Sequence, residues 1–225
     1  GQNLSAQRFI GSAILGMNAC QIEGDDVHGF YKIGVNGGAG VTLPLNRKQT
    51  WSVSAELLYT QKGSYKRYLS AGAFDTTNYA PSMFTDVDRT KPFNNKLKCN
   101  ISLDYVQIPV IFHYEDMTSG CSFGLGFSWS RLVRAKEVYN GFTRTTNVRS
   151  HTYNISDWSF LADANIRLYK NLTLNVRWEY SLVPIRTVNF DYQRNDGTVD
   201  SYINKMHNHL VSLRLIYYIN EKFVP

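Results

Sequence analysis

The five histidines are the residues of this chain best suited to acid–base or nucleophilic chemistry, and their surroundings predict no active site. Nucleophilic catalysis needs a serine or a similar group beside a histidine that a third residue orients. The chain contains no G-x-S-x-G motif. His28 closely follows Asp25 and Asp26, but clusters of this kind are common in polar loops. We therefore predict that the protein is not an enzyme.

Two stretches carry residue types that bind metals, and neither supplies enough ligands. The segment "MHNHL" places His207 and His209 on one face of a strand, with no third ligand nearby. The segment "EGDD" offers Glu23, Asp25 and Asp26 to a divalent cation but lacks the ligand count of a calcium loop. A wet interfacial histidine pair and a solvated acidic turn are the simpler interpretations. The sequence thus predicts no metal site and no cofactor.

The elements that must position these residues are strands. The stretch "WSVSAELLYTQKGS" over 51–64 alternates apolar and polar residues, and side chains on a strand point alternately to its two faces. Aromatic residues make up 14% of the chain, which favours strands, and no run approaches the length of a membrane-spanning helix. The chain begins at Gly1 rather than at a methionine, as expected after removal of a signal peptide. Period-2 segments predict one domain, 1–225, with eight strands at 8–22, 31–45, 50–66, 100–115, 121–138, 156–170, 172–188 and 206–220.

The connections between these strands alternate strictly in length. Three are short, "NRKQ", "EDMTSG" and "KN", and they follow the second, fourth and sixth strands. The other four, the longest of them at 67–99, are longer and follow the odd-numbered strands. Bacterial outer-membrane barrels combine short periplasmic turns with long external loops. We therefore predict an all-β, eight-stranded antiparallel up-and-down transmembrane barrel in the bacterial outer membrane, with both termini and the short turns periplasmic and the long loops external.

The polar face of the strands indicates which side meets lipid. An eight-stranded barrel has an interior just wide enough to be filled by side chains, and the apolar, aromatic set is too large for it. The polar set mixes small residues with a few charges of both signs, which suits a narrow lumen. We expect an ionic network across the lumen among Glu56, Asp163, Arg167, Arg177, Glu179 and Arg214. Because proline cannot donate a ladder hydrogen bond, we also expect bulges at Pro109 and Pro184.

Three stretches resemble a known family. They read "GSAILGMNACQIEGDDVHGFYKIGVNGGAGVTLPL", "SAELLYTQKGS" and "LDYVQIPVIFHY", and they are similar to the PorT-like outer-membrane barrels of Bacteroidetes. The first hairpin is most similar to that of the PorG-like members, which implies a component of the type IX protein secretion system. The resemblance also implies, as partners, the periplasmic ring built from a PorK-like lipoprotein and PorN. The alternatives are a surface adhesin or binding module acting through the external loops, and a porin or lipid enzyme, which the filled lumen and missing triad disfavour.

The net charge of +6 raises nucleic acid as a candidate partner, but the basic residues are scattered and form no nucleic-acid-binding motif. We therefore predict no nucleic acid as a partner. One group of cations does surround the third external loop: Arg131, Arg134, Lys136, Arg144 and Arg149. These side chains could pair with lipopolysaccharide phosphates among the outer-membrane lipids, and simple solvation is an equally good interpretation.

The three cysteines divide between the two rims of the predicted barrel. Cys20 and Cys99 fall near the external rim, on strands that are not neighbours, so their pairing stays open. Cys121 begins a strand directly after a short turn and is therefore expected at the periplasmic rim, about 30 Å away across the bilayer. Two interpretations remain for Cys121: an unpaired thiol, or an intermolecular disulfide to a periplasmic partner. For a PorG-like protein, the resemblance suggests the PorK-like lipoprotein as that partner.

Overall fold

The computed structural model describes residues 9–24, 29–46, 48–69, 96–116, 119–139, 142–146, 148, 151–193 and 199–219. Within these ranges no helix is long and apolar enough to cross a membrane. The same ranges contain ten strands: β1 Ile10–Glu23, β2 Lys32–Pro44, β3 Trp51–Leu69, β4 Lys96–Asp116, β5 Cys121–Tyr139, β6 Phe142–Thr146, β7 Ser156–Tyr169, β8 Leu172–Ser181, β9 Arg186–Gln193 and β10 Val199–Tyr218.

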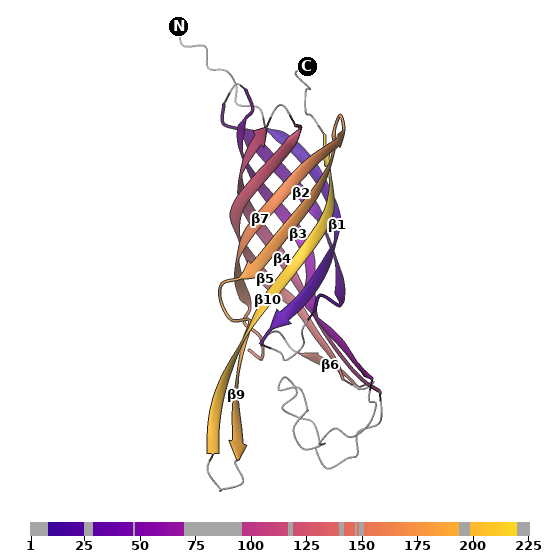
Figure 1. The fold of residues 1–225 in the computed structure, drawn as a ribbon, viewed down its shortest axis with the longest axis vertical. Coiled ribbons are helices and arrows are strands. Elements are labelled where there is room, and N and C mark those ends of the chain that lie inside the picture. The colour runs from indigo at the N-terminus through magenta and orange to yellow at the C-terminus, as the bar shows by residue number, and fades with distance from the viewer. Residues whose placement is uncertain are drawn as a thin grey trace.

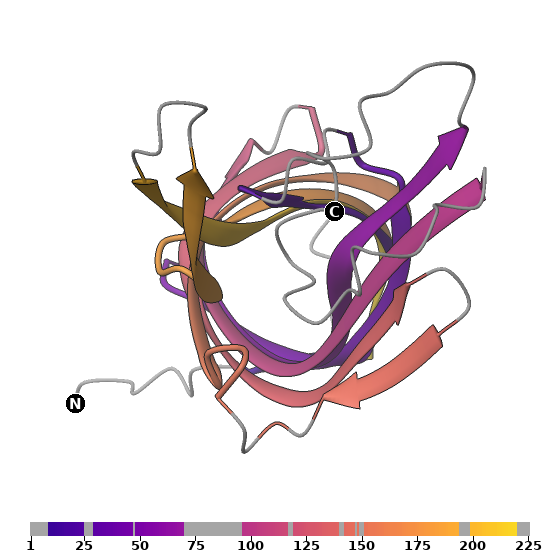
Figure 2. The same ribbon diagram turned by 90° about the horizontal axis from the view of Figure 1, so that it is seen from below.

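Eight of the strands form a closed ring. Their order is β1-β2-β3-β4-β5-β7-β8-β10, all neighbours are antiparallel, and β10 pairs back onto β1 from Ser12↔Tyr218 to Glu23↔His207. Figure 2 shows this ring in a view along its axis. The start of β1, the end of β10 and the short connections lie at one end of the barrel, which we name the turn end, and the other end is the loop end (Figure 1). The predicted eight-stranded up-and-down antiparallel fold is confirmed.

The alternation within each strand sends apolar side chains outward. On β5, Phe123, Leu125 and Phe127 are 57–61% exposed, whereas the intervening Gly124 and Gly126 are buried. Near the turn end, the outward Trp51 ring packs on Phe112 and Tyr114, with ring centroids 5.0 and 4.8 Å apart. Such an outward apolar surface with aromatic residues at its margin is typical of barrels that face lipid. The larger apolar set therefore covers the wall, and the smaller polar set fills the lumen.

Two expectations about proline were wrong in detail. The strand predicted at 172–188 is two strands, because β8 ends at Ser181 and β9 begins at Arg186, with Pro184 in the break between them. No bulge occurs at Pro109, which pairs with Ser128 in unbroken register. Instead, the β3–β4 ladder omits the pairs between Ala55↔Val110 and Leu58↔Gln107 without changing register. The β3–β4 ladder therefore accommodates the missing N–H of Pro109 by losing hydrogen bonds rather than by forming a bulge.

The register shift on β4 lies closer to the loop end than Pro109, between Asp104 and Tyr105. Beyond this point several strands extend further than the sequence indicated. β3 and β4 remain paired as far as Leu69↔Lys96, β6 adds to the loop end of β5, and β9 pairs with the first half of β10. The central part of the 67–99 connection, residues 70–95, lies outside the described residues. The β2–β3 ladder ends at Asn36↔Thr60, so the loop-end part of the β3–β4 hairpin splays away from the ring (Figure 2).

Side chains fill most of the described lumen, and a small polar cavity remains at the turn end. A small apolar cluster of Ile14, Leu58 and Ile216 lies toward the turn end. A larger apolar cluster occupies the loop end, where Tyr153 and Ile185 from the connections join residues of the strands. Its buried members are Ile22, Ile101, Leu103, Tyr105, Leu132, Ala135, Tyr153, Ile185, Val188 and Met206. Polar and charged side chains fill much of the remaining lumen, and they make up the candidate site.

Candidate functional site

The layer nearer the turn end contains two arginines and two carboxylates, and we name it the double-arginine layer. Arg177 binds Glu56 in a bidentate manner, with both N–O distances at 2.9 Å, and its Nη2 also lies 2.9 Å from Asp163 Oδ2. Arg214 Nη1 lies 2.9 Å from Glu56 Oε2. All four residues are buried, with exposures of 6% or less. The layer is formally neutral, as expected where charges are removed from water.

Strand register and glycine make room for this layer. Asp163 and Arg177 are direct partners across the β7–β8 ladder. Arg214 stands opposite Gly16 on β1, where an added Cβ would lie 2.6 Å from Arg214 Cγ. Glycine at this inward position therefore supplies the space for a large guanidinium in a narrow barrel.

A second layer lies nearer the loop end and depends on one lysine. Lys62 Nζ lies 3.1 Å from Asp157 Oδ2 and 2.5 Å from Glu179 Oε1, and the lysine is fully buried. Neutral donors add to the shell of the two carboxylates. Gln107 Nε2 donates to Glu179 at 2.8 Å, Asn208 Nδ2 donates to Asp157 at 3.1 Å, and the Ser181 hydroxyl donates to the other oxygen of Asp157. We name this group the lysine layer. Its single cation faces two acids, so the amide donors carry part of the stabilisation.

The six residues predicted for one network occupy three places. Glu56, Asp163, Arg177 and Arg214 meet in the double-arginine layer, and Glu179 belongs to the lysine layer. Arg167 lies in neither layer: its Nη2 is 3.6 Å from Glu115 Oε1 at the turn end. The assignment of Arg167 to the lumen network is thus corrected, because the end of β7 reaches the rim where the lumen meets solvent.

Two members of the lysine layer were absent from the prediction, Lys62 and Asp157. Both stand near the loop-end boundary of a predicted strand, where charged residues are normally solvated. The signal that could have found them is parity, meaning the odd or even position along a strand that decides which face a side chain points to. Lys62 has the same inward parity as Glu56, and Asp157 has the same parity as Asp163. Because β3 extends to Leu69, position 62 lies well inside the barrel rather than at its rim.

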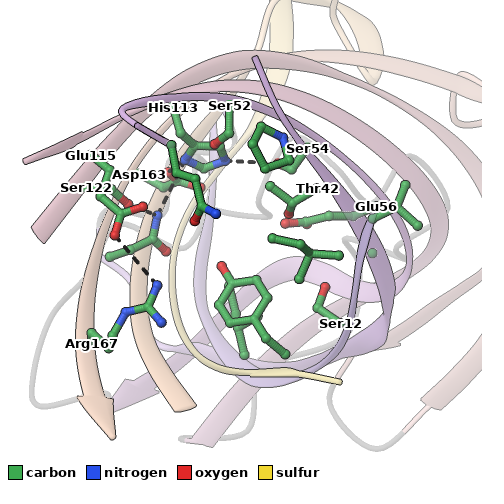
Figure 3. A pocket seen from close by; sticks show the side chains of 18 residues that line it. Ser12, Thr42, Ser52, Ser54, Glu56, His113, Glu115, Ser122, Asp163 and Arg167 are labelled. Carbon is green, nitrogen blue, oxygen red and sulfur yellow. Dashed lines mark hydrogen bonds and ion pairs between the residues drawn. The ribbon is translucent and has the colours of Figure 1, made fainter. Parts of the chain in front are cut away.

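A polar cavity of about 50 Å³ opens on the turn-end side of the double-arginine layer (Figure 3). Ser54 Oγ lies 2.9 Å from His113 Nε2, and His113 Nδ1 lies 3.5 Å from Asp163 Oδ1. Gly124 permits this approach, because an added Cβ would lie 2.4 Å from the carboxylate oxygen and 2.6 Å from Nδ1. His113 was not predicted as a site residue.

These three residue types are those of a serine hydrolase, but their geometry suits a polar seal better. A His–Asp separation of 3.5 Å exceeds the usual length of a charge-assisted hydrogen bond. The other carboxylate oxygen of Asp163 accepts from Arg177, which draws its charge away from the imidazole. Ser54 is only 6% exposed. Within the described residues, no group of three or more His, Cys, Asp or Glu side chains could hold a metal ion.

The cysteines fall at opposite ends of the barrel. Cys121 opens β5 at the turn end, is partly exposed and carries an unpaired thiol. Cys20 is also unpaired but is buried, and its Sγ lies 3.6 Å from the carbonyl oxygen of Gln61. A Cys20–Cys99 disulfide is therefore not formed, although the Cys99 side chain lies outside the described residues.

The predicted basic group is described in part. Arg131, Arg134 and Lys136 are exposed on the outer face of β5. Arg134 Nε lies 2.7 Å from Asp104 Oδ2 on the neighbouring strand. The side chain of Arg144 and the whole of Arg149 lie outside the described residues.

The wall formed by β8, β10 and β1 has a different character at the same end. Trp178 Nε1 donates to His209 Nε2 at 2.7 Å, and Tyr180 stacks on His207 at a centroid distance of 5.8 Å. The hydroxyl of Tyr180 donates to Glu23 at 2.8 Å. The two histidines thus take part in an aromatic girdle, which agrees with their interpretation as an interfacial pair.

One of the comparisons with known proteins, that with family models, agrees with this architecture. A family model described as an outer membrane protein β-barrel domain matches residues 11–187. The chain is similar to the solved structure of Neisserial surface protein A, with 13% identity and a TM-score of 0.46, over 94% of this chain and 97% of that one. It is also similar to Ail of Yersinia pestis, with 12% identity and a TM-score of 0.42, over 93% of this chain and 99% of that one. The comparison with curated protein sequences gave no match.

Proposed function

Because the chain belongs to the family of outer membrane proteins with a β-barrel domain, we propose that it is a non-enzymatic, non-conducting barrel that acts through its rims and outer wall. The protein lies in the bacterial outer membrane. The filled lumen carries this proposal, since two buried ionic layers and a large apolar cluster at the loop end occupy it. A solute would have to break both layers in order to pass.

Conductance of the purified barrel in planar bilayers tests the closed lumen. We expect no steady single-channel steps, whereas regular steps of porin size would contradict the proposal. The non-enzymatic part has a separate test at Ser54. A fluorophosphonate probe should leave the wild-type protein unlabelled, because the hydroxyl is buried and the His–Asp contact is long. Labelling that disappears in Ser54→Ala would overturn it.

We propose further that the barrel is a component of the type IX protein secretion system and contacts the periplasmic ring of a PorK-like lipoprotein and PorN. The resemblance of the first hairpin to PorG-like barrels supports this proposal. The turn end is the end expected in the periplasm, and it presents the partly exposed thiol of Cys121. An intermolecular disulfide at Cys121 would tether the ring to the outer membrane in an oxidising compartment.

Non-reducing electrophoresis of native envelopes tests the tether. We expect a higher-mass species in the wild type that is lost on reduction and absent from Cys121→Ser, and mass spectrometry should identify a periplasmic lipoprotein in it. Cys20→Ser is the matched control, because its thiol is buried at the other end and should not affect the species. Identical monomer bands in all lanes would contradict the proposed disulfide at Cys121. Lysine crosslinking in the same envelopes would still report ring contact without a disulfide.

A surface-binding module is the second candidate, and the strand extensions at the loop end favour it. β3 and β4 remain paired to Leu69↔Lys96, and the β9–β10 ladder also continues beyond the ring (Figure 1). Such hairpins can present loops above the membrane. Replacing residues 70–95 with a short Gly–Ser turn should abolish adhesion but spare secretion if this function holds. The reverse result would support the secretion component.

A further inference from the structure

The outer wall at the loop end of β4 and β5 changes abruptly from apolar to basic, whereas the outward Ile33 and Val35 of the nearby β2 are apolar. On β4 the outward residues Val106, Ile108, Val110 and Phe112 are 37–50% exposed. With Tyr114 they form a band roughly 20 Å tall, at about 3.4 Å per residue on a strand tilted by about 40°. This height approaches the apolar band of about 25 Å found on membrane barrels. The outward residues just above Val106 therefore lie at the level of lipid headgroups.

Three cations from two strands meet above this band. Lys32 Nζ on β2 lies 2.6 Å from Ser102 Oγ and 3.0 Å from Asn100 Oδ1 on β4. Ser102 is in turn the ladder partner of Lys136 on β5. Arg134 stands two residues before Lys136, and both side chains are exposed. Lys32 was not predicted to belong to the basic residues of this region, because it lies far from the others along the chain.

Gly63 explains how Lys32 reaches a strand that is not its neighbour. β3 lies between β2 and β4, and its residue opposite Ser102 is Gly63. With no side chain at this position, the lysine can cross the width of β3. The backbone there has a φ of +141°, and an added Cβ would lie 2.0 Å from the carbonyl oxygen of Ile101. Glycine is thus required both by the conformation and by the close packing.

The cluster has more positive than negative charge. Asp104 is its acidic member among the described side chains, and one of its oxygens is held by Arg134 at 2.7 Å. Lys32 contacts neutral oxygen acceptors, and within the described residues neither Lys32 nor Lys136 forms an ion pair. Like charges gathered at headgroup level are stabilised by an anion, and phosphate accepts hydrogen bonds from lysine and arginine together.

We propose that Lys32, Arg134 and Lys136 bind a phosphate group of the lipid A part of lipopolysaccharide in the outer leaflet. Position selects this occupant. Arg134 and Lys136 lie on the outer wall immediately beyond the lipid-facing band. The half-buried Lys32 starts from an inward position of β2 and reaches their level through Ser102, the ladder partner of Lys136. A phosphate attached to acyl chains is held beside the barrel at this level. The aromatic wall of β8, β10 and β1 has no such group of lysine and arginine among the residues already named for it. The site is therefore one-sided, and it is independent of the proposed role in secretion.

Native mass spectrometry of the full-length protein in detergent tests this site with purified bis-phosphorylated lipid A as the probe. We expect the wild type to retain one lipid A. The double variant Lys32→Gln/Lys136→Gln should reduce the affinity by about a hundredfold, roughly tenfold for each lost charged contact. Millimolar inorganic phosphate should not displace the lipid, because it lacks the acyl chains that lie against the band.

Matched controls separate the site from general charge effects. Lys48→Gln/Lys170→Gln removes the same charge from exposed positions at the turn end and should bind lipid A as the wild type does. Dephosphorylated lipid A should bind the wild type as weakly as the double variant binds the intact lipid. Heat-modifiable electrophoretic migration verifies that each variant is folded. Equal retention of lipid A by both double variants, or equal retention of both lipids by the wild type, would overturn the proposal.

Discussion

The two ionic layers of the lumen both stabilise a pair of buried carboxylates, but with different residues. The double-arginine layer pairs two guanidinium groups with two carboxylates, and Glu56 is held by both arginines. The lysine layer has Lys62 alone between Asp157 and Glu179, and neutral amides and the Ser181 hydroxyl supply further hydrogen bonds. Guanidinium donors form a rigid fork that matches a carboxylate, whereas an ammonium is a compact point charge. The first layer therefore contains redundant cations, and the second depends on one.

The two layers also differ in how closely solvent approaches them. The double-arginine layer adjoins the polar cavity, which Glu56 and Asp163 help to line, so water can approach it from the turn end. The lysine layer is covered by the large apolar cluster, and Lys62 lies 5.1 Å from the centre of the Tyr105 ring. A charge left unpaired in the lysine layer has less access to solvent. This comparison predicts an order of effects for the loss of a single cation.

The largest effect is expected for Lys62→Met. This variant leaves two buried carboxylates without any cation in their layer, and breaking a buried ion pair costs about 3–5 kcal/mol. We expect a loss of at least this size in the free energy of unfolding, measured by urea denaturation of the barrel in lipid vesicles with tryptophan fluorescence. Lys170→Met, at an exposed turn position, is the control and should leave stability unchanged. Wild-type stability of Lys62→Met would show that the layer does not depend on its lysine.

A smaller effect is expected for Arg177→Met. Arg214 remains 2.9 Å from Glu56 and 3.8 Å from Asp163, so each carboxylate keeps a cation nearby. We expect a loss of about 2–3 kcal/mol, at or below the lower limit for a broken buried pair. Arg177→Lys should recover part of this loss, because it restores the charge without the bidentate geometry. A loss greater than that of Lys62→Met in the same assay would reverse the comparison between the layers.

A third variant tests the packing below the double-arginine layer. Gly124→Ala places a methyl group within 2.6 Å of both His113 Nδ1 and Asp163 Oδ1, so the two side chains must move apart. Overpacking of this kind costs about 1–3 kcal/mol. Gly37→Ala is the control, since its added Cβ would meet its nearest atoms at 3.4 and 3.5 Å, an ordinary contact distance. Equal stability of the two alanine variants would indicate that the cavity yields without cost.

The fold could be predicted from the sequence because it follows from short-range regularities. The alternation around Phe123 and Leu125 specifies strands, and the strict sorting of short and long connections specifies an up-and-down barrel. The site was predictable only where parity and charge coincided in the middle of a strand, as at Glu56 and Arg177. Parity alone cannot fix the depth of a residue. Arg167 has the correct parity but lies at the rim.

The missed residues illustrate the same limit. Lys62 lies within the lumen because β3 continues beyond its predicted end, and that extension depends on pairing with β4, far away along the chain. Lys32 reaches its partners across Gly63, a contact that exists only after three strands have paired. His113 meets Ser54 through the β3–β4 ladder, and Asp163 from β7 completes the group. Long-range register sets these contacts, and no local pattern of one sequence encodes it.

The smallest effect is expected on the outer wall, where Arg134 pairs with Asp104. The distance of 2.7 Å resembles those of the lumen layers, but the arginine side chain is 59% exposed. Solvent screening reduces exposed ion pairs to about 0–1 kcal/mol. Arg134→Gln should therefore lower the free energy of unfolding by no more than about 1 kcal/mol, and the difference from the wild type should shrink as salt is raised. The effect of Lys62→Met should be much less sensitive to salt, because water and ions do not reach that layer. Salt titrations of the urea midpoint for both variants measure this contrast. A salt-independent loss for Arg134→Gln as large as that for Lys62→Met would mean that burial of the Asp104 carboxylate, rather than exposure of its partner, determines the strength of an ion pair in this barrel.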